Sequence, residues 1–194
     1  MRASHHNGGM STASGDFDLT TDELRAVARF ASESAETVLP VFEEAHPADG
    51  RPRAALAAAW EFVGGARRTR LQRVTALEAH RAAREADSEA ARLAARSAGD
   101  AAAAAYLHPL ARATQVGHIL RAAASAARIA ELAADGDPQA GARAVEDARR
   151  RASPVVVDVL RRYPPPPSAT NRVAELMSSL DSALRDGSPP GGAG

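Results

Sequence analysis

Residues 67–97, RRTRLQRVTALEAHRAAREADSEAARLAARS, carry the strongest helical signal in the chain. No proline or glycine interrupts them over about eight turns at 3.6 residues per turn. Small apolar residues recur here at three- and four-residue spacing, namely Ala76, Ala79, Ala83, Ala86, Ala90, Leu93 and Ala94. We therefore expect a single long helix whose alanine-rich face lets a neighbouring helix approach closely.

A glycine is expected to end this long helix. Gly99 stands between Ser97 and Asp100, two polar residues that favour a break or a new cap. Asp100 would then be the first-turn acid of a helix that begins with the alanine run at residues 101–105. This arrangement predicts two helices joined near residue 99.

Pro109 marks the next expected interruption, because its ring crowds the preceding turn and it has no backbone N–H to donate. A further helix should run from there to about residue 134. One of its faces carries Gln115, His118, Ala122, Ser125, Ile129 and Leu132. Because Ile129 and Leu132 should face the core, we expect Gln115 and His118 to face inward as well.

The N-terminal part predicts two helices around a polar turn. The first should begin at Thr20 and be stopped or bent by Pro40. The turn is EAHPADGRPR, residues 44–53. In it, Pro52 suits the first turn of a new helix, and Asp49 can accept hydrogen bonds from the free N–H groups there.

The C-terminal third predicts shorter helices. One should cover residues 139–151 and another should start at Pro154, before the four prolines at residues 164–167. These prolines form a stiff spacer. A final helix then carries an apolar stripe made of Val173, Leu176, Met177, Leu180 and Leu184. Such a stripe must dock on its own domain, on a second copy of the chain, or on a foreign partner.

These patterns divide the 194 residues into four parts. We predict a disordered tail at 1–16, an all-helical domain at 17–163, a proline linker with an amphipathic helix at 164–186, and a disordered tail at 187–194. The expected fold class is all-α, as a helical bundle or an irregular helical array of about six or seven helices.

Charge and cysteine content exclude several classes of function. The chain has 24 arginines, no lysine and 24 acidic residues, so its net charge is zero and a dedicated nucleic-acid binder is not expected. Arginine clusters at residues 67–73 and 149–151 should be solvated helix faces balanced by nearby acids. There is no cysteine, no apolar run long enough for a membrane, and no signal-peptide pattern. We expect a cytoplasmic protein that contacts no membrane.

A search for catalytic motifs finds none. The sequence lacks HExxH, GxSxG, a P-loop and a dinucleotide fingerprint, so we predict no enzyme, no catalytic residue and no cofactor. One alternative stays open: His46, His80 and His118 could meet between helices and bind zinc or iron. The chain would then be a metal-dependent hydrolase or a small-molecule binder. Otherwise these histidines are hydrogen-bonded structural residues.

Three segments point to a known family. The turn EAHPADGRPR, the helical segment AHRAAREAD at residues 79–87 and the later HIL at 118–120 resemble the helical putative immunity proteins of bacterial polymorphic toxin systems. The likeness covers roughly residues 24–132. It implies an all-helical, non-enzymatic protein that binds and blocks a cognate toxin. The polar positions that it implicates in partner binding or in structure are His46, Asp49, Arg51, Arg53, His80, Arg84 and His118.

Overall fold

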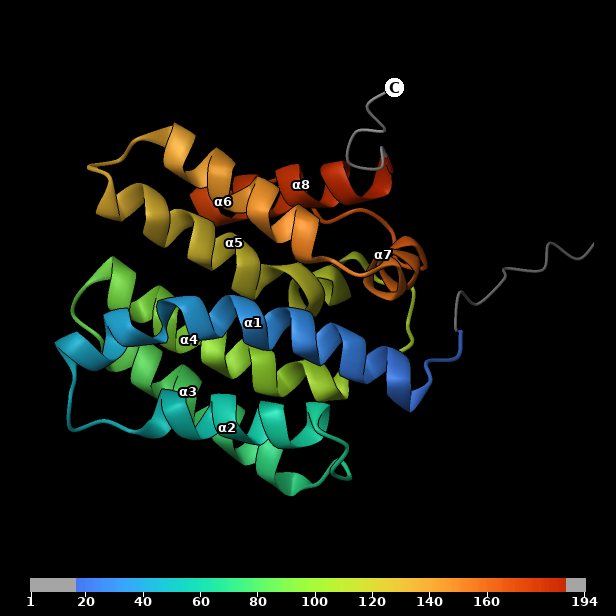
Figure 1. Ribbon diagram of the computed structural model, residues 1–194, viewed down its shortest axis with the longest axis horizontal. Coiled ribbons are helices and arrows are strands. Elements are labelled where there is room, and N and C mark those ends of the chain that lie inside the picture. Colours follow the sequence, from blue (N-terminus) through green and yellow to red (C-terminus); the bar gives the residue numbers. More distant parts are fainter. Residues whose placement is uncertain (1–16, 188–194) are drawn as a thin grey trace, which may run out of the picture.

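The computed structural model describes residues 17–187, and within them every regular element is a helix (Figure 1). The α-helices are α1 (Thr21–Ala45), α2 (Arg51–Val63), α3 (Arg70–Glu85), α4 (Glu89–Ala103), α5 (Val116–Ala133), α6 (Pro138–Arg151), α7 (Pro154–Arg161) and α8 (Arg172–Arg185). Two 3-10 helices, η1 (Ala104–Tyr106) and η2 (Ala113–Gln115), lie between α4 and α5. The predicted all-α class is confirmed, with eight α-helices in this range in place of six or seven. The tails predicted at 1–16 and, beyond Gly187, at 188–194 fall outside the described residues.

The long helix expected over residues 67–97 is in fact two helices. α3 ends at Glu85, and α4 begins after Ser88, whose hydroxyl accepts a hydrogen bond from the backbone N–H of Ala91 at 3.1 Å. The prediction was wrong because the cap at Ser88 outweighs the helix propensity of its neighbours. The break lets α4 turn back along α3, so that their alanine-rich faces pack against each other.

Gly99 does not end a helix, because α4 runs through it to Ala103. A Cβ atom on Gly99 would lie 2.9 Å from Cε1 and 3.0 Å from both ring nitrogens of His80. Glycine therefore allows α4 to lie against the imidazole ring of α3. The chain leaves helical structure after Tyr106 and resumes it at η2, so the break expected at Pro109 is confirmed.

α1 passes through Pro40 and continues to Ala45, so Pro40 does not stop it. Pro40 is exposed, whereas Leu39 and Phe42 are buried on the opposite side of the helix. The burial of these side chains outweighs the loss of one backbone hydrogen bond at the proline. At the other end of α1, the capping box that begins with Thr20 is present as predicted.

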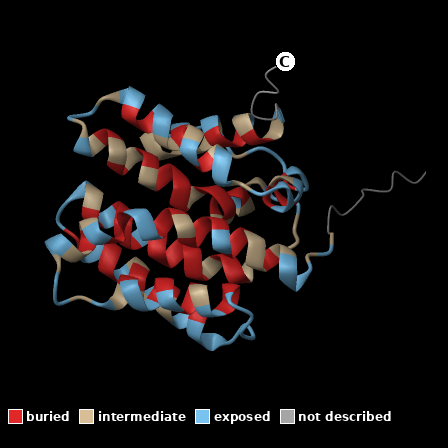
Figure 2. Cartoon of the chain, in the orientation of Figure 1, coloured by how far each residue is buried: buried red, intermediate tan, exposed pale blue. Residues whose placement is uncertain are grey.

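The helices form layers around α1, α4 and α5. α2 and α3 cover one side of α1 and α4, and α5 covers the other side, while α6 and α8 pack outside α5 (Figure 1). Buried residues concentrate along the central helices (Figure 2). The core is rich in alanine, which permits close helix approach, and it is filled by a few larger side chains. The largest fully buried ones are Tyr163, Phe42, Phe62, Ile119, Leu120, Leu160 and Leu180.

The apolar stripe of α8 is covered by the chain's own helices. Leu176, Leu180 and Leu184 are buried where α8 packs against α5 and α6. Of the three docking modes that the sequence allowed, the structure therefore uses the chain's own fold. Between residues 17 and 187, no helix has the length and apolarity needed to cross a lipid bilayer.

Candidate functional site

The polar turn between α1 and α2 forms one cluster of charged residues. Arg51 donates to Asp49 with Nη2 2.6 Å from Oδ2, and the same nitrogen lies 2.5 Å from Glu85 Oε2 at the end of α3. Arg53 makes a two-pronged contact with Glu43, at 2.5 and 2.6 Å, that joins α2 to α1. The hydrogen bond from Arg51 lowers the pKa of Asp49. We call this set the turn cluster, and it ties three helix ends together.

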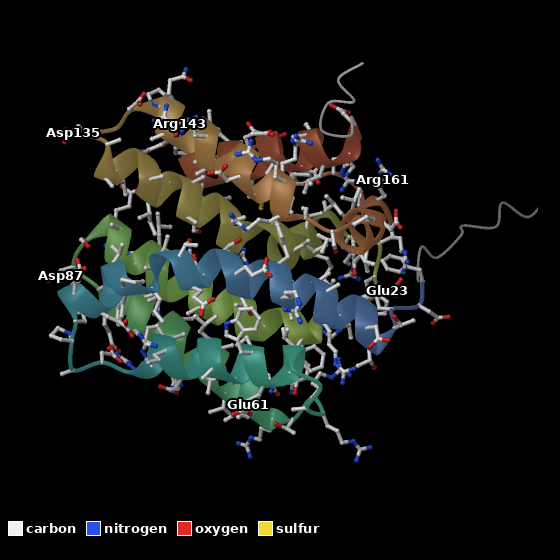
Figure 3. All side chains as sticks on the ribbon, in the orientation of Figure 1. Glu23, Glu61, Asp87, Asp135, Arg143 and Arg161 are labelled. Carbon is white, nitrogen blue, oxygen red and sulfur yellow. The ribbon has the colours of Figure 1, made fainter. Side chains whose placement is uncertain are left out.

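His46 belongs to the same end of the molecule. Its ring stacks on Phe42 with centroids 4.9 Å apart, and its Nε2 lies 3.1 Å from Oδ1 of Asp87 in the break between α3 and α4. Figure 3 shows Asp87 at that junction. His46 therefore lies between the end of α1 and the α3–α4 turn, and its Nε2 makes no hydrogen bond to any residue from 17 to 187.

A second cluster joins α3, α4 and α5. Asp100 is buried on α4, with 1 % of its surface exposed, and accepts two hydrogen bonds from Arg121 of α5 at 2.9 and 3.1 Å. Nε2 of His80 lies 3.7 Å from Asp100 Oδ1. The two-pronged Arg121 contact satisfies the buried carboxylate and fixes its orientation. Asp100 is thus an interior residue, contrary to the prediction that it begins a new helix.

His80 and His118 share a cavity beside this carboxylate. The cavity has a volume of about 370 Å³ and is lined by Arg73, Ala76, Leu77, His80, Ala103, Tyr106, His108 and His118. Because the chain is not helical around Pro109, His108 comes to the same cavity as His118, which a continuous helix would have prevented. Nδ1 of His118 is buried and has no hydrogen-bond partner among residues 17–187.

Burial holds both imidazoles in the neutral form. Desolvation lowers the pKa of His80 and of His118 below the ordinary value of 6.5, and the charge of Arg121 lowers both further, against the opposing effect of Asp100. A neutral imidazole has one donor and one acceptor nitrogen. At neutral pH the cavity therefore offers hydrogen-bonding groups from its histidines and positive charge from Arg73.

The surface of α3 that faces solvent is apolar and basic. Leu71, Val74 and Leu77 are 44, 39 and 56 % exposed, and they alternate with Arg70 and Arg73. We call these five residues the α3 outer face. Leu77 and Arg73 also line the cavity, so this face and the cavity are continuous.

The structure separates the residues that the sequence grouped together. His46, Asp49, Arg51 and Arg53 lie in the turn cluster, while His80 and His118 line the cavity. Arg84 is exposed on α3, one helical turn from His80. No group of three His, Asp or Glu residues in the described part of the chain is placed to hold a metal ion. The arrangement of His46, His80 and His118 thus gives no support to a shared metal site.

Asp100, Arg121 and Tyr106 were missed as members of the candidate site. Arg121 follows His118 by three residues on one face of α5, a spacing that could have linked them. The ring of Tyr106 contacts the guanidinium groups of Arg68 and Arg73, which lie 5.0 and 4.6 Å from its centroid, and its hydroxyl donates to Thr69 O at 2.6 Å. These contacts hold the cavity rim in place.

Comparison with known proteins gives one match. A family model described as Imm-5 like putative immunity protein matches residues 18–153, which are more than half of the chain. The matched range contains α1 to α6 and therefore both clusters and the α3 outer face. No curated protein and no solved structure matches the chain significantly.

Proposed function

The chain belongs to the Imm-5 like putative immunity protein family, and on that premise we propose that it binds a cognate toxin and blocks it. In this proposal the protein acts in the cytoplasm, has no enzymatic activity and works by covering a surface that the toxin needs. The family match supports the general role.

The observation that carries the proposal is the exposure of large apolar side chains on one helix. Among residues 17–187, the exposed large hydrophobic residues are Leu71, Val74, Leu77 and Val155, and the first three lie on α3. Exposed apolar side chains that gather on one surface mark interaction sites. An apolar centre with polar groups at its edge is also the usual composition of a protein interface.

The rest of the fold supports such a role by holding α3 in position. Arg51 connects the end of α3 to the turn before α2, and Asp100 with Arg121 fixes α4 against α5 behind the cavity. A surface held rigidly before binding loses little conformational entropy when the partner docks. We infer that the turn cluster is structural and that contacts with the toxin come from α3.

The test is capture of the tagged protein from its native cells, followed by expression of the captured protein with and without the chain. We expect a stoichiometric partner that arrests growth alone and does not arrest it when the chain is present. A captured partner that is harmless alone would contradict the immunity role. One bound metal ion per chain without a protein partner would instead favour a ligand site at His80 and His118.

A further inference from the structure

We propose that the α3 outer face recognises an acidic segment of the partner protein, in which carboxylates flank an apolar side chain. This inference deepens the proposed function and rests on it for the identity of the partner as a toxin. It concerns the chemistry of the bound surface, which the family match does not describe.

Charge is distributed unevenly in this chain. Residues 66–84 contain six arginines and one glutamate, a net charge of +5, whereas the whole chain is neutral. The remaining residues therefore carry a net charge of −5. The single glutamate, Glu78, is already paired with Arg81, at 2.5 Å. The positive charge of this region thus has little compensation from its own segment.

The arginines of α3 also lack acidic partners from elsewhere in the fold. Among the described residues, no carboxylate lies within ion-pair distance of Arg67, Arg70 or Arg73. On α6, by contrast, Arg150 pairs with Asp147. Opposite charges across an interface speed association and select the correct partner. The unpaired arginines therefore favour a surface rich in Asp and Glu.

The apolar residues favour a protein over a nucleic acid. Leu71, Val74 and Leu77 are spaced by three residues, so they form a ridge along about two turns of α3. Burying this ridge requires apolar groups on the partner, which a phosphate backbone does not supply. The aromatic ring of the region, Tyr106, already contacts the guanidinium groups of Arg68 and Arg73, which would compete with a base for its face.

The adjoining cavity could bind a side chain of the partner. Its volume of about 370 Å³ accommodates one or two side chains, and Arg73 and Leu77 stand at its border with the α3 outer face. His118 lines this cavity, and its buried Nδ1 has no hydrogen-bond partner among residues 17–187. A carboxylate that enters beside Arg73 would meet both positive charge and hydrogen-bonding groups. We infer that one acidic side chain of the partner occupies this cavity.

A photo-crosslinking residue placed at Leu77 tests the location of the interface, with the same residue at Arg143 as the control. Arg143 is exposed on α6, far from α3 in Figure 3. Both full-length variants are expressed in the native cells and irradiated, and crosslinked peptides are identified by mass spectrometry. We expect a protein adduct from position 77 alone, in a peptide of net negative charge. Adducts to nucleic acid, adducts from position 143 alone, or no adduct from position 77 would overturn the proposal.

Charge reversal tests the chemistry. Arg70→Glu should weaken binding of the crosslinked partner by about tenfold or more, because Arg70 faces the proposed acidic segment. An acid in the first turn of α3 is favourable for the helix, so folding should not suffer. A Glu→Arg change in the partner segment should restore binding, and Arg143→Glu should change affinity less than about twofold. Equal affinities for Arg70→Glu and the wild type would refute the acidic segment.

The two proposals fail in different ways. If the crosslinked partner has no toxicity, the immunity role fails while the acidic contact at position 77 still stands. If the wild type neutralises a toxin and Arg70→Glu neutralises it equally well at limiting concentrations, the immunity role stands and the proposed contact surface is wrong.

Discussion

Gly141→Ala is expected to destabilise the protein strongly, although alanine normally favours a helix. Gly141 lies in α6 against Glu131 of α5, whose side chain is 1 % exposed. A Cβ atom at position 141 would lie 2.3 Å from Oε1 and 2.7 Å from Cδ of Glu131. Both distances are well below van der Waals contact, so Glu131 or the whole of α6 must move.

Glu131 cannot move without losing hydrogen bonds. Its carboxylate accepts from Arg172 of α8 at 2.5 Å and from Arg128 at 3.1 Å. Breaking a buried ion pair costs about 3 to 5 kcal/mol, whereas replacing glycine by alanine in a helix recovers about 1 kcal/mol. The free energy of unfolding should therefore fall by about 2 to 4 kcal/mol. In a chain of this length that lowers Tm by roughly 10 °C.

Urea denaturation of three further variants separates the steric clash with Glu131 from the effect of helix propensity. Ala142→Gly, at an exposed position of the same helix, should cost about 1 kcal/mol and measures helix propensity alone. Glu131→Ala should be destabilising by itself. In that background, Gly141→Ala should raise stability by about 1 kcal/mol, because the obstructing carboxylate is gone. If Gly141→Ala is neutral or stabilising in the wild type, α6 does not pack on Glu131 as described and the reasoning is refuted.

Three other outcomes can be measured on the purified protein. Ala83→Leu should lower the free energy of unfolding by about 1 to 3 kcal/mol in urea, because Ala83 is 4 % exposed and a larger side chain overpacks its site. The hydrogen bond from Arg162 lowers the pKa of Glu23 from 4.5 to about 2, so stability should fall as pH drops through that range, and Glu23→Gln should flatten the pH profile. Burial lowers the pKa of His80 and of His118 below 6.5, so on acidification the unfolded chain binds protons before the folded chain does. The free energy of unfolding should therefore fall as the pH drops below about 6.5. If His118→Gln leaves the dependence of this free energy on pH unchanged, the prediction is contradicted for His118.

Sequence patterns predicted helices well where local signals decide the structure. The cap at Thr20, the break at Pro109 and the helix that became α5 were all expected and are present. A single helix over residues 67–97 and a helix end at Gly99 are two of the predictions that were wrong. The first overlooked the N-cap at Ser88, whereas the second weighed local propensity at a place where packing between α3 and α4 decides the structure. The N-cap at Ser88 could have been recognised in the sequence. The reason for glycine at position 99 could not, because His80 lies against Gly99 only once α3 and α4 have packed together.

The candidate site could be predicted only in part for a similar reason. Asp49 and Arg51 are two residues apart, so their pairing follows from local geometry. Glu85 joins the same cluster from 34 residues along the chain, and Arg121 reaches Asp100 across 21 residues. Such partners depend on how helices are placed relative to one another. The sequence therefore identified the polar turn, but it could not separate that turn from the cavity around His118.

The arginines of α3 show where sequence reasoning could have gone further. We expected the clusters at residues 67–73 and 149–151 to be balanced by nearby acids, and this holds on α6, where Arg149 pairs with Glu146 three residues before it. On α3, Arg70 and Arg73 stand three residues apart, and neither has an acidic partner among residues 17–187. Like charges at this spacing disfavour a helix by a few tenths of a kcal/mol per pair. This arrangement does not help α3 to fold, and it agrees with the proposal that the α3 outer face binds an acidic segment.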